Sequence, residues 1–166
     1  LEGKILRHAS AGGLVFGICG GYQMLGAEVH DPDGVEAGAG KCVRGMELLP
    51  ARTVFEPEKH RTQITGHFGI VQGAFAELTD VPFAGYEIHM GKTECMGETE
   101  PLLHLDSGTA DGMQHGNVYG CYIHGIFDQA EVVTAVLKTI LKRKGLDADQ
   151  VKNIDRKQYK EEQYDN

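Results

Sequence analysis

The sequence predicts an α/β domain with an open, mostly parallel sheet flanked by helices, to which short antiparallel strands are added. The first observation is the continuous apolar run Leu14–Phe16, which is typical of a strand buried on both faces of a parallel sheet. The second is the glycine-rich turn that leads from this run directly into a helix. The third is the amphipathic stretch Asp128–Lys144, the strongest helix signal in the chain. A length of 166 residues suffices for one domain with a sizeable core.

The N-terminal part of the chain alternates between helix and strand signals. Leu1–Ser10 has the pattern of the end of a helix, and Ala11-Gly12-Gly13 supplies its stop. After the apolar run Leu14–Phe16 and the glycine turn, a short helix is expected from Tyr22 to about Val29. His30–Lys41 contains Asp-Pro, Asp-Gly and several glycines, and it is predicted to be a surface loop.

The middle of the chain is predicted to consist of short strands separated by turn residues. The candidates are Met46–Phe55, Gln63–Val71, Gly85–Met90, Leu102–Leu105 and Val118–Ile123.

The C-terminal part is predicted to be helical. Asp128 can cap the helix that ends at Gly145. Its core-facing stripe is predicted to comprise Val132, Val133, Val136, Leu137, Ile140 and Leu141. A second short helix is expected over Leu146–Asn153, and the polar tail Ile154–Asn166 is expected to be helical but incomplete.

Composition and charge exclude several classes of protein. With 41% hydrophobic and 24% charged residues, the chain has the balance of an ordinary globular protein. Its net charge of −8 argues against nucleic acid or an anionic membrane surface as the main partner. No apolar run approaches the ~18 residues of a membrane span, and there is no signal-peptide pattern. The four cysteines have no CxxC spacing, which indicates neither a zinc site nor a disulfide framework and favours a reducing cytoplasm.

The segment Gly17-Ile18-Cys19-Gly20-Gly21 has the form of a nucleophile elbow that carries a thiol. Glycines are needed there because a side chain beside the nucleophile would collide with the neighbouring strand or block the substrate. The thiol would lie at a helix N-terminus, where partial positive charge favours the reactive thiolate. Two alternatives remain open from these residues alone: an inert buried cysteine, and a glycine turn that binds phosphate.

A cysteine nucleophile needs a base, and His124 is the strongest of the eight histidines. It follows a predicted strand and precedes a glycine turn, and ligands gather at the carboxyl ends of strands in open α/β sheets. From position alone, a partly buried structural histidine is an equal alternative. Glu87 and His89 share one face of the strand Gly85–Met90, where they could line a site or form a structural pair.

The remaining thiols and histidines are assigned no chemistry. Cys121 lies in mid-strand without a following elbow and is interpreted as a buried spectator, while Cys42 and Cys95 are interpreted as spectators or exposed thiols. No HxH or HExxH spacing is present, so no metal site is predicted.

Three segments together resemble class I (triad-type) glutamine amidotransferases, and more narrowly the cobyric acid synthase family. They are Gly17–Gly26, Gly85–Thr93 and Gly120–Asp128, they occur in the family's order, and the resemblance runs from about Leu14 to the C-terminus. The set is highly specific, whereas each segment alone is moderately so. The resemblance implies a flavodoxin-like α/β fold.

The resemblance also implies roles for individual residues. The family's nucleophile falls on Cys19, its catalytic histidine on His124, and a glutamine that helps to hold the substrate on Gln23. Gly20 would supply one oxyanion N–H. The strand pattern, independently of the resemblance, makes Glu87 and His89 candidates for substrate contact or for supporting the site.

One position departs from the wider class. The Glu that usually stands two residues after the histidine is replaced by Ile126. The cobyric acid synthase family is similar in lacking this Glu, so the resemblance implies a Cys–His dyad. Asp128 and Glu87 are candidates for holding His124.

At the level of domains, the resemblance implies that residues 1–166 are a partial glutaminase domain without its first strands. A Pro-Gly-Ser type loop with the second oxyanion donor, and an N-terminal ATP-dependent synthetase domain of the same polypeptide, would precede it. The glutaminase domain would need no cofactor, while ATP and Mg²⁺ would act in the synthetase domain. The isolated chain is accordingly expected to be a weak or inactive glutaminase.

The implied reaction is glutamine hydrolysis that supplies ammonia to the synthetase domain. That domain would amidate the b, d, e and g carboxylates of a corrinoid acceptor, adenosylcobyrinic acid a,c-diamide. Two alternatives are kept. One is an amidotransferase of the same branch with another acceptor, of the lipid II or cobyrinic acid a,c-diamide type. The other is a non-catalytic amidase-like docking domain.

Overall fold

The computed structural model describes residues 1–36 and 38–148. Its helical elements are α1 (Glu2–Ser10), α2 (Gly20–Leu25), the 3-10 helices η1 (Gly73–Leu78) and η2 (Ile126–Asp128), and α3 (Ala130–Arg143). Its strands are β1 (Val15–Ile18), β2 (Glu28–Asp31), β3 (Lys41–Arg44), β4 (Ala51–Phe68), β5 (Pro82–Cys95), β6 (Leu103–Leu105), β7 (Ala110–Asp111), β8 (Met113–His115) and β9 (Val118–Cys121).

The strands form two open sheets with helices beside them. One has the order β1-β9-β8, and the other has the order β3-β2-β4-β6-β7 with β5 paired to β4. The predicted α/β class is confirmed, together with its added antiparallel strands. Among the described strands, however, only β1 with β9 and β2 with β4 pair in parallel, so the sheets are mixed rather than mostly parallel. The physical reason is that short loops join most of the strands after β2, and short loops allow only antiparallel neighbours.

The parallel pair β1–β9 forms the centre of the first sheet. Phe16 on β1 stacks on Tyr119 of β9, with ring centroids 6.1 Å apart. It also contacts Phe127 edge to face at 4.9 Å. Tyr119 and Val132 of α3 are fully buried in the same core. The packing therefore fixes β1 and β9 against α3, and with them the residues that follow the two strands.

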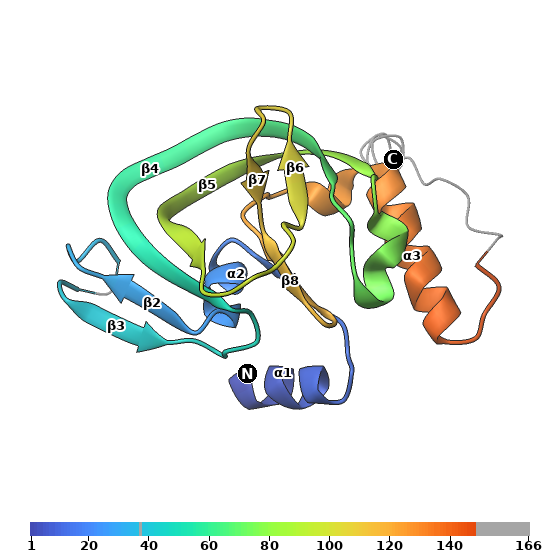
Figure 1. Cartoon of the computed structure of the whole chain (residues 1–166), viewed down its shortest axis with the longest axis horizontal. Helices are drawn as coiled ribbons and strands as arrows, with labels where there is room; N and C mark the ends of the chain where they lie inside the picture. The colour runs from blue at the N-terminus through green and yellow to red at the C-terminus, as the bar shows by residue number, and fades with distance from the viewer. Residues whose placement is uncertain (37, 149–166) are drawn as a thin grey trace, which may run out of the picture.

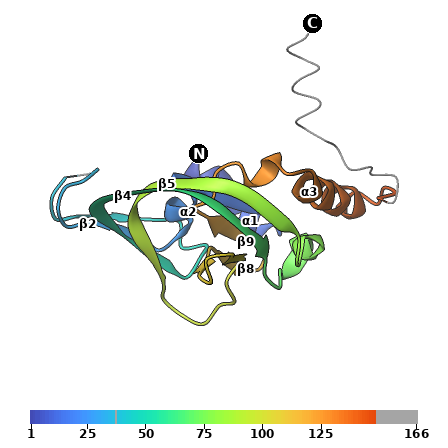
Figure 2. The ribbon, with the colours of Figure 1, turned by 90° about the horizontal axis from the view of Figure 1, so that it is seen from above.

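A long two-stranded ribbon, β4 with β5, dominates the molecule and arches over the other elements (Figures 1 and 2). The separate strands predicted over Met46–Phe55 and Gln63–Val71 are in fact one continuous strand of 18 residues. Its charged middle, which includes Pro57, lacks the alternation of a half-buried strand. Pairing with β5 nevertheless continues through it, with a register shift between Val54 and Lys59.

The predicted loop His30–Lys41 and the end of the preceding helix also differ from expectation. Helix α2 ends at Leu25, and the chain then forms the short strand β2. The fully buried Asp31 organises the loop, because its carboxylate accepts the backbone N–H groups of Val35, Glu36 and Gly38 at 2.7, 2.9 and 3.1 Å. One carboxylate thus holds the β2–β3 hairpin at a defined register.

Helix α3 is present, but its cap and its buried face are not those predicted. It begins at Ala130 with Gln129 as N-cap, while Asp128 belongs to η2. Of the predicted apolar stripe only Val132 is buried, and Ile140 is 37% exposed. The buried side chains are instead Val132, Thr134, Ala135 and Thr139. The spacing of apolar residues alone does not determine which face of the helix packs on the core, because threonines can be buried there as well.

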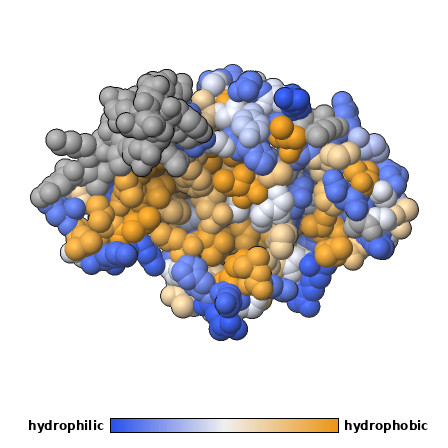
Figure 3. Space-filling view, turned by 180° about the vertical axis from the view of Figure 1, so that it is seen from behind, coloured by the Kyte–Doolittle hydropathy of each residue, from blue (hydrophilic) through white to orange (hydrophobic). Residues whose placement is uncertain are grey.

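The exposed large hydrophobic side chains include Ile140 of α3 and Leu146. Figure 3 shows a broad hydrophobic area on the side opposite the view of Figure 1.

Ala148 and the two residues before it form no helix, and the rest of the predicted helix Leu146–Asn153 and the tail Ile154–Asn166 lie outside the described residues. None of the helices described here combines the length and hydrophobicity that crossing a membrane requires.

Candidate active site

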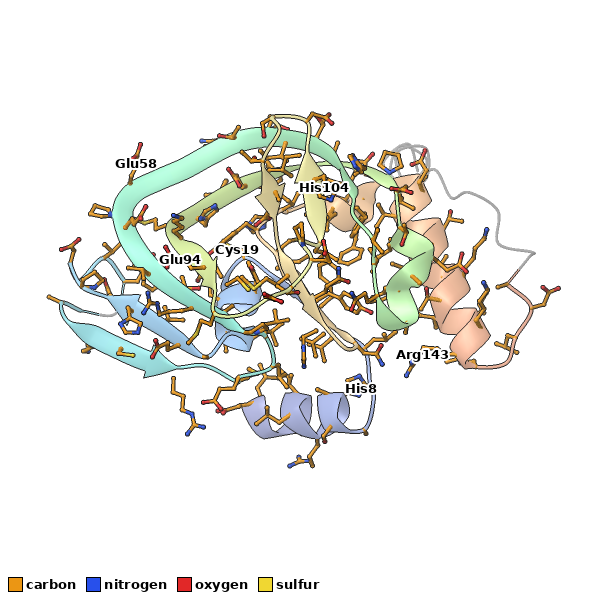
Figure 4. The ribbon with its side chains drawn as sticks, viewed as in Figure 1. His8, Cys19, Glu58, Glu94, His104 and Arg143 are labelled. Atoms are coloured by element: carbon orange, nitrogen blue, oxygen red, sulfur yellow. The ribbon has the colours of Figure 1, made fainter. Side chains whose placement is uncertain are left out.

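The turn between β1 and α2 places Cys19 in a strained backbone conformation. Its φ of 53° and ψ of −114° lie in a region that residues other than glycine rarely adopt. A Cβ on Gly17 would come within 2.6 Å of Leu25 Cδ1 and 2.8 Å of the Gly21 backbone. Figure 4 shows Cys19 beside α2, inside the curve of β4 and β5. The predicted strand–elbow–helix arrangement is therefore present, with strain concentrated on the thiol residue.

The Cys19 thiol is half-buried between β9 and β5. Its N–H donates to Cys121 O at 2.9 Å, and its Sγ donates to Ile88 O at 3.5 Å. Burial raises the pKa of the Cys19 thiol, while the backbone N–H of Gly20 lowers it by a smaller amount. The lowering by the Gly20 N–H has the direction expected at a helix N-terminus, but burial has the larger effect. Desolvation of the sulfur outweighs the few backbone dipoles of a six-residue helix.

His124 is held by the backbone and ring of Tyr86 on β5. The two residues exchange backbone hydrogen bonds of 2.8 and 3.1 Å, and their rings stack with centroids 5.3 Å apart. Within the described part of the chain, the buried His124 Nε2 has no hydrogen-bond partner. Glu87, one candidate for orienting His124, instead lies with Oε2 3.5 Å from His89 Nε2. The backbone hydrogen bonds and ring stacking of His124 are therefore with Tyr86, not with Glu87.

Sheet register brings Cys19 and His124 to the same edge of the first sheet. Ile18 pairs with Cys121 in the parallel pair β1–β9, so both catalytic candidates follow the carboxyl ends of adjoining strands. Strand β5 then contacts both, through Ile88 O at Cys19 and through Tyr86 at His124.

Gln23 is buried, 9% exposed, one turn of α2 after Cys19. Its Nε2 donates to the Tyr122 hydroxyl at 3.3 Å. The same hydroxyl lies 2.5 Å from Thr93 Oγ1, which lies 2.7 Å from Thr53 Oγ1. A buried chain of hydrogen bonds therefore fixes the Gln23 side chain, and the sequence contained no signal for this chain.

Glu87 and His89 share the opposite face of β5 from Tyr86, as the period-2 pattern predicts. The His89 ring stacks on Tyr122 at 3.7 Å, and His89 Nδ1 lies 2.9 Å from Gly91 O. Both residues line a pocket of about 470 Å³. Tyr86 and Ile88 line a different pocket, of about 440 Å³. The structure thus connects Glu87 and His89 to Gln23 through Tyr122.

Asp111 was not found by sequence reasoning. It lines the 470 Å³ pocket, and its Oδ2 accepts the Tyr122 N–H at 2.9 Å. Burial raises the pKa of Asp111 despite hydrogen bonds from the Tyr122 and Gly112 backbones. An isolated Ala-Asp-Gly segment gives no sign that its carboxylate is buried.

The burial of the other thiols agrees with the sequence interpretation, although Cys121 is the last residue of β9 rather than in mid-strand. Cys121 is fully buried, and its pKa is raised well above the ordinary value by desolvation. Cys42 and Cys95 are exposed.

Comparison with known proteins decides the family. The sequence model of the CobB/CobQ-like glutamine amidotransferase domain matches residues 1–132. This chain belongs to that family. A cobyric acid synthase of Lachnoclostridium phytofermentans is 44% identical over 178 residues, which cover 99% of this chain and 34% of that protein. A cobyric acid synthase of Ruminiclostridium cellulolyticum is 46% identical over 171 residues, which cover 99% of this chain and 33% of that protein.

The chain therefore spans about a third of the length of these curated relatives. A solved glutamine amidotransferase structure matches with a TM-score of 0.50 and 18% identity, covering 87% of this chain and 68% of that one. This likeness supports the class I glutamine amidotransferase-like fold. In a CobB/CobQ-like domain, the elbow at Cys19 is the natural candidate for glutamine chemistry.

Proposed function

We propose that this chain is the glutaminase domain of a cobyric acid synthase, and that it hydrolyses glutamine through a thioester on Cys19. The observation that carries the proposal is the left-handed backbone of Cys19, with φ of 53°, at the end of a strand paired to the one that His124 follows. A strained turn of this kind persists only where the surrounding packing imposes it, and such strain clusters at functional sites.

In the first half-reaction, Cys19 Sγ attacks the side-chain amide carbon of glutamine. Because burial raises the pKa of the Cys19 thiol, a base has to take its proton at neutral pH. His124 Nε2, which has no hydrogen-bond partner among the described groups, is the proposed acceptor. As the carbon–nitrogen bond breaks, His124 returns this proton to the departing ammonia and a thioester remains.

In the second half-reaction, water attacks the thioester carbon. His124 accepts a proton from the water, the carbon–sulfur bond breaks, and the proton passes to the departing sulfur. Glutamate leaves and the thiol is restored. The Gly20 N–H, which lies close enough to the sulfur to affect its pKa, is the proposed oxyanion donor.

Gln23 is proposed to help hold the substrate glutamine. Its place after Cys19 and its fixed side chain, bonded to the Tyr122 hydroxyl at 3.3 Å, support this role. Glu87 and His89 act indirectly in the proposal, because His89 stacks on Tyr122 rather than on Cys19 or His124. Asp128 remains a candidate for holding His124.

The ammonia is proposed to reach an N-terminal synthetase domain of the same polypeptide. There ATP and Mg²⁺ would activate the b, d, e and g carboxylates of adenosylcobyrinic acid a,c-diamide. The names and lengths of the two curated relatives support this acceptor and this domain. An acceptor of the lipid II or cobyrinic acid a,c-diamide type, or a docking role without catalysis, is the alternative.

Labelling of the full-length protein with diazo-oxo-norleucine, a glutamine-mimicking electrophile, tests the nucleophile. We expect one label on Cys19, no label in Cys19→Ser, and normal labelling in the matched control Cys121→Ser. Ammonia-dependent amidation in Cys19→Ser would show that the variant is folded. Labelling that survives Cys19→Ser and disappears in Cys121→Ser would overturn the assignment.

The acceptor is tested with the same full-length protein. Glutamine- and ATP-dependent conversion of the a,c-diamide should be observed, and Cys19→Ser should retain it with ammonia in place of glutamine. If the protein labels on Cys19 but amidates only lipid II, the glutaminase proposal holds and the corrinoid acceptor fails.

A further inference from the structure

Strands β2 and β3 bring three different metal-binding side chains to one point, away from Cys19. His30 Nε2 lies 2.9 Å from Glu28 Oε1. Cys42 Sγ lies 3.5 Å from His30 Nε2 and 3.8 Å from Glu28 Oε2. Among the described residues, this is the group of His, Cys, Asp and Glu whose ligand atoms all lie within 4.8 Å of one another.

The fold sets this convergence in place. His30 and Cys42 are directly opposite in the antiparallel pair, and Glu28 lies two residues before His30 on the same face of β2. Strand β2 is itself paired on its other side to β4, and the Asp31 carboxylate fixes the connecting loop. The site is therefore built on a sheet rather than on a mobile loop, as a specific binding site requires.

A catalytic relay does not explain this arrangement. In a thiol–imidazole–carboxylate relay, the carboxylate binds one ring nitrogen and the thiol faces the other. Here both Glu28 and Cys42 face the same nitrogen, Nε2 of His30. His30 Nε2 is nearest to Oε1 of Glu28 and Cys42 Sγ to Oε2, and one ligand atom from each of the three residues lies within 4.8 Å of the other two, the pattern of a metal site.

The separations fit a tetrahedral ion. Zinc bonds of about 2.0–2.2 Å to nitrogen and oxygen and about 2.3 Å to sulfur give ligand-to-ligand distances of about 3.4–3.6 Å. The observed distances are 2.9 Å from His30 Nε2 to Glu28 Oε1, 3.5 Å from His30 Nε2 to Cys42 Sγ, and 3.8 Å from Cys42 Sγ to Glu28 Oε2. Rotation of the Glu28 carboxylate to offer one oxygen to both partners would bring the three ligand atoms to these separations.

We propose that Glu28, His30 and Cys42 bind a borderline-soft divalent cation, Zn²⁺, through carboxylate oxygen, Nε2 and thiolate sulfur. Cys42 releases its proton to solvent on binding, so the carboxylate and thiolate together balance the ion's charge. Because Cys42 is exposed, the fourth position opens to water. The mixed oxygen, nitrogen and sulfur set favours Zn²⁺ over Mg²⁺ or Ca²⁺, which select oxygen ligands.

Two arginines lie beside Glu28 without opposing this role. Sheet register places Arg44 and Arg52 opposite Glu28 on its two sides. Arg44 is paired with Glu47 at 3.0 Å, and Arg52 lies 3.6 Å from Glu94. Their charge is therefore largely compensated by other carboxylates. The sequence expectation of no metal site relied on ligand spacing within one segment, whereas these ligands come from two strands.

Titration of the metal-free full-length protein with Co²⁺, a spectroscopic probe for zinc sites, tests the proposal. We expect one equivalent to bind with a near-ultraviolet thiolate-to-cobalt charge-transfer band and visible bands of tetrahedral intensity. Zn²⁺ should displace the Co²⁺. The Cys19→Ser background should give the same spectrum, so this result stands apart from the test of the glutaminase site.

The ligands are tested one by one with a matched thiol control. Cys42→Ser should abolish the charge-transfer band. His30→Gln and Glu28→Gln should each weaken Co²⁺ binding by at least about 10-fold to 100-fold, because loss of a group that only supports a ligand already has an effect of that size. Cys95→Ser, which removes another exposed thiol, should change neither. A charge-transfer band that persists in Cys42→Ser, or no saturable binding by the intact protein, would overturn the proposal.

Discussion

At the scale of single residues, Cys19 is distinguished by its strained backbone conformation and not by a lowered thiol pKa. Its φ of 53° turns the thiol out of β1 at the cost of about 1–3 kcal/mol of strain. Burial at the same time raises the pKa of the thiol, which keeps it protonated in the absence of a base. In the proposed mechanism, Cys19 therefore needs a base such as His124 to take its proton.

The raised pKa of Asp111 predicts how the stability of the protein depends on pH. Because burial raises its pKa, the folded state binds the Asp111 proton more tightly than the unfolded state does. Its stabilising contribution is thus full at acid pH and is lost as pH rises through the raised pKa. In Asp111→Asn the amide oxygen can still accept the Tyr122 N–H. We expect the free energy of unfolding of wild type to fall relative to Asp111→Asn between acid and neutral pH.

Denaturant unfolding at a series of pH values measures this difference. Glu98→Gln, which neutralises an exposed carboxylate, is the matched control and should show a smaller pH-dependent difference from wild type. A constant offset between wild type and Asp111→Asn across the pH range would contradict the raised pKa.

At the scale of elements, β5 organises the candidate site from outside the sheet that carries it. It contacts the Cys19 sulfur through Ile88 O and holds His124 through Tyr86. Close approach is possible because Gly85 has no side chain: a Cβ there would come within 2.3 Å of His124 O and 2.6 Å of Ile123 Cγ2. The glycine before Tyr86 is therefore required by the neighbouring strand end.

Gly85→Ala should lower the kcat of glutamine hydrolysis by about 100-fold, because a displacement of about 1 Å at a catalytic group has an effect of that size. Its added methyl has to push β5 away from His124, whereas the methyl in Gly97→Ala meets open space. Steady-state kinetics on the full-length variants, with melting temperatures as a check on folding, measures the effect. A folded Gly85→Ala protein with the kcat of Gly97→Ala would refute this account of β5.

The features predicted correctly from the sequence are those that neighbouring residues determine. The elbow at Cys19 and the alternation of Tyr86, Glu87 and Ile88 are encoded by neighbouring residues, and both were predicted. Strand β2 and the continuous β4 were missed, because their hydrogen bonds come from partners distant in the chain. The contact of Gln23 with Tyr122 depends likewise on tertiary packing. Candidate residues could be found from sequence, but the groups that hold them could not.

At the scale of the whole molecule, β1 lies at the edge of its sheet in the part of the chain that the structure describes. Among the described strands, the strand with the candidate nucleophile thus pairs with β9 alone, and the side of the molecule opposite the view of Figure 1 carries a broad hydrophobic area (Figure 3). The curated relatives are about three times as long as this chain. The rest of such a protein has unpaired backbone and apolar surface to pack against.

The 166-residue chain expressed alone should hydrolyse glutamine at least about 100-fold more slowly than the full-length protein, as expected for the loss of one oxyanion donor. Ammonia release measured at equal molar concentration, with circular dichroism to confirm folding, makes the comparison. Equal turnover by the two proteins would mean that the chain contains a complete oxyanion site.

The pairing of β1 with β9 also sets the order of events during synthesis. Val15 pairs with Val118, so roughly a hundred residues separate strands that must meet before Cys19 faces His124. The ribosome releases the thiol long before it releases the imidazole. On a growing chain, the β2–β3 and β4–β5 hairpins can close first, since their partners are near in sequence. If Cys19 and His124 act together as proposed, a nascent chain cannot hydrolyse glutamine until β9 has emerged and paired with β1.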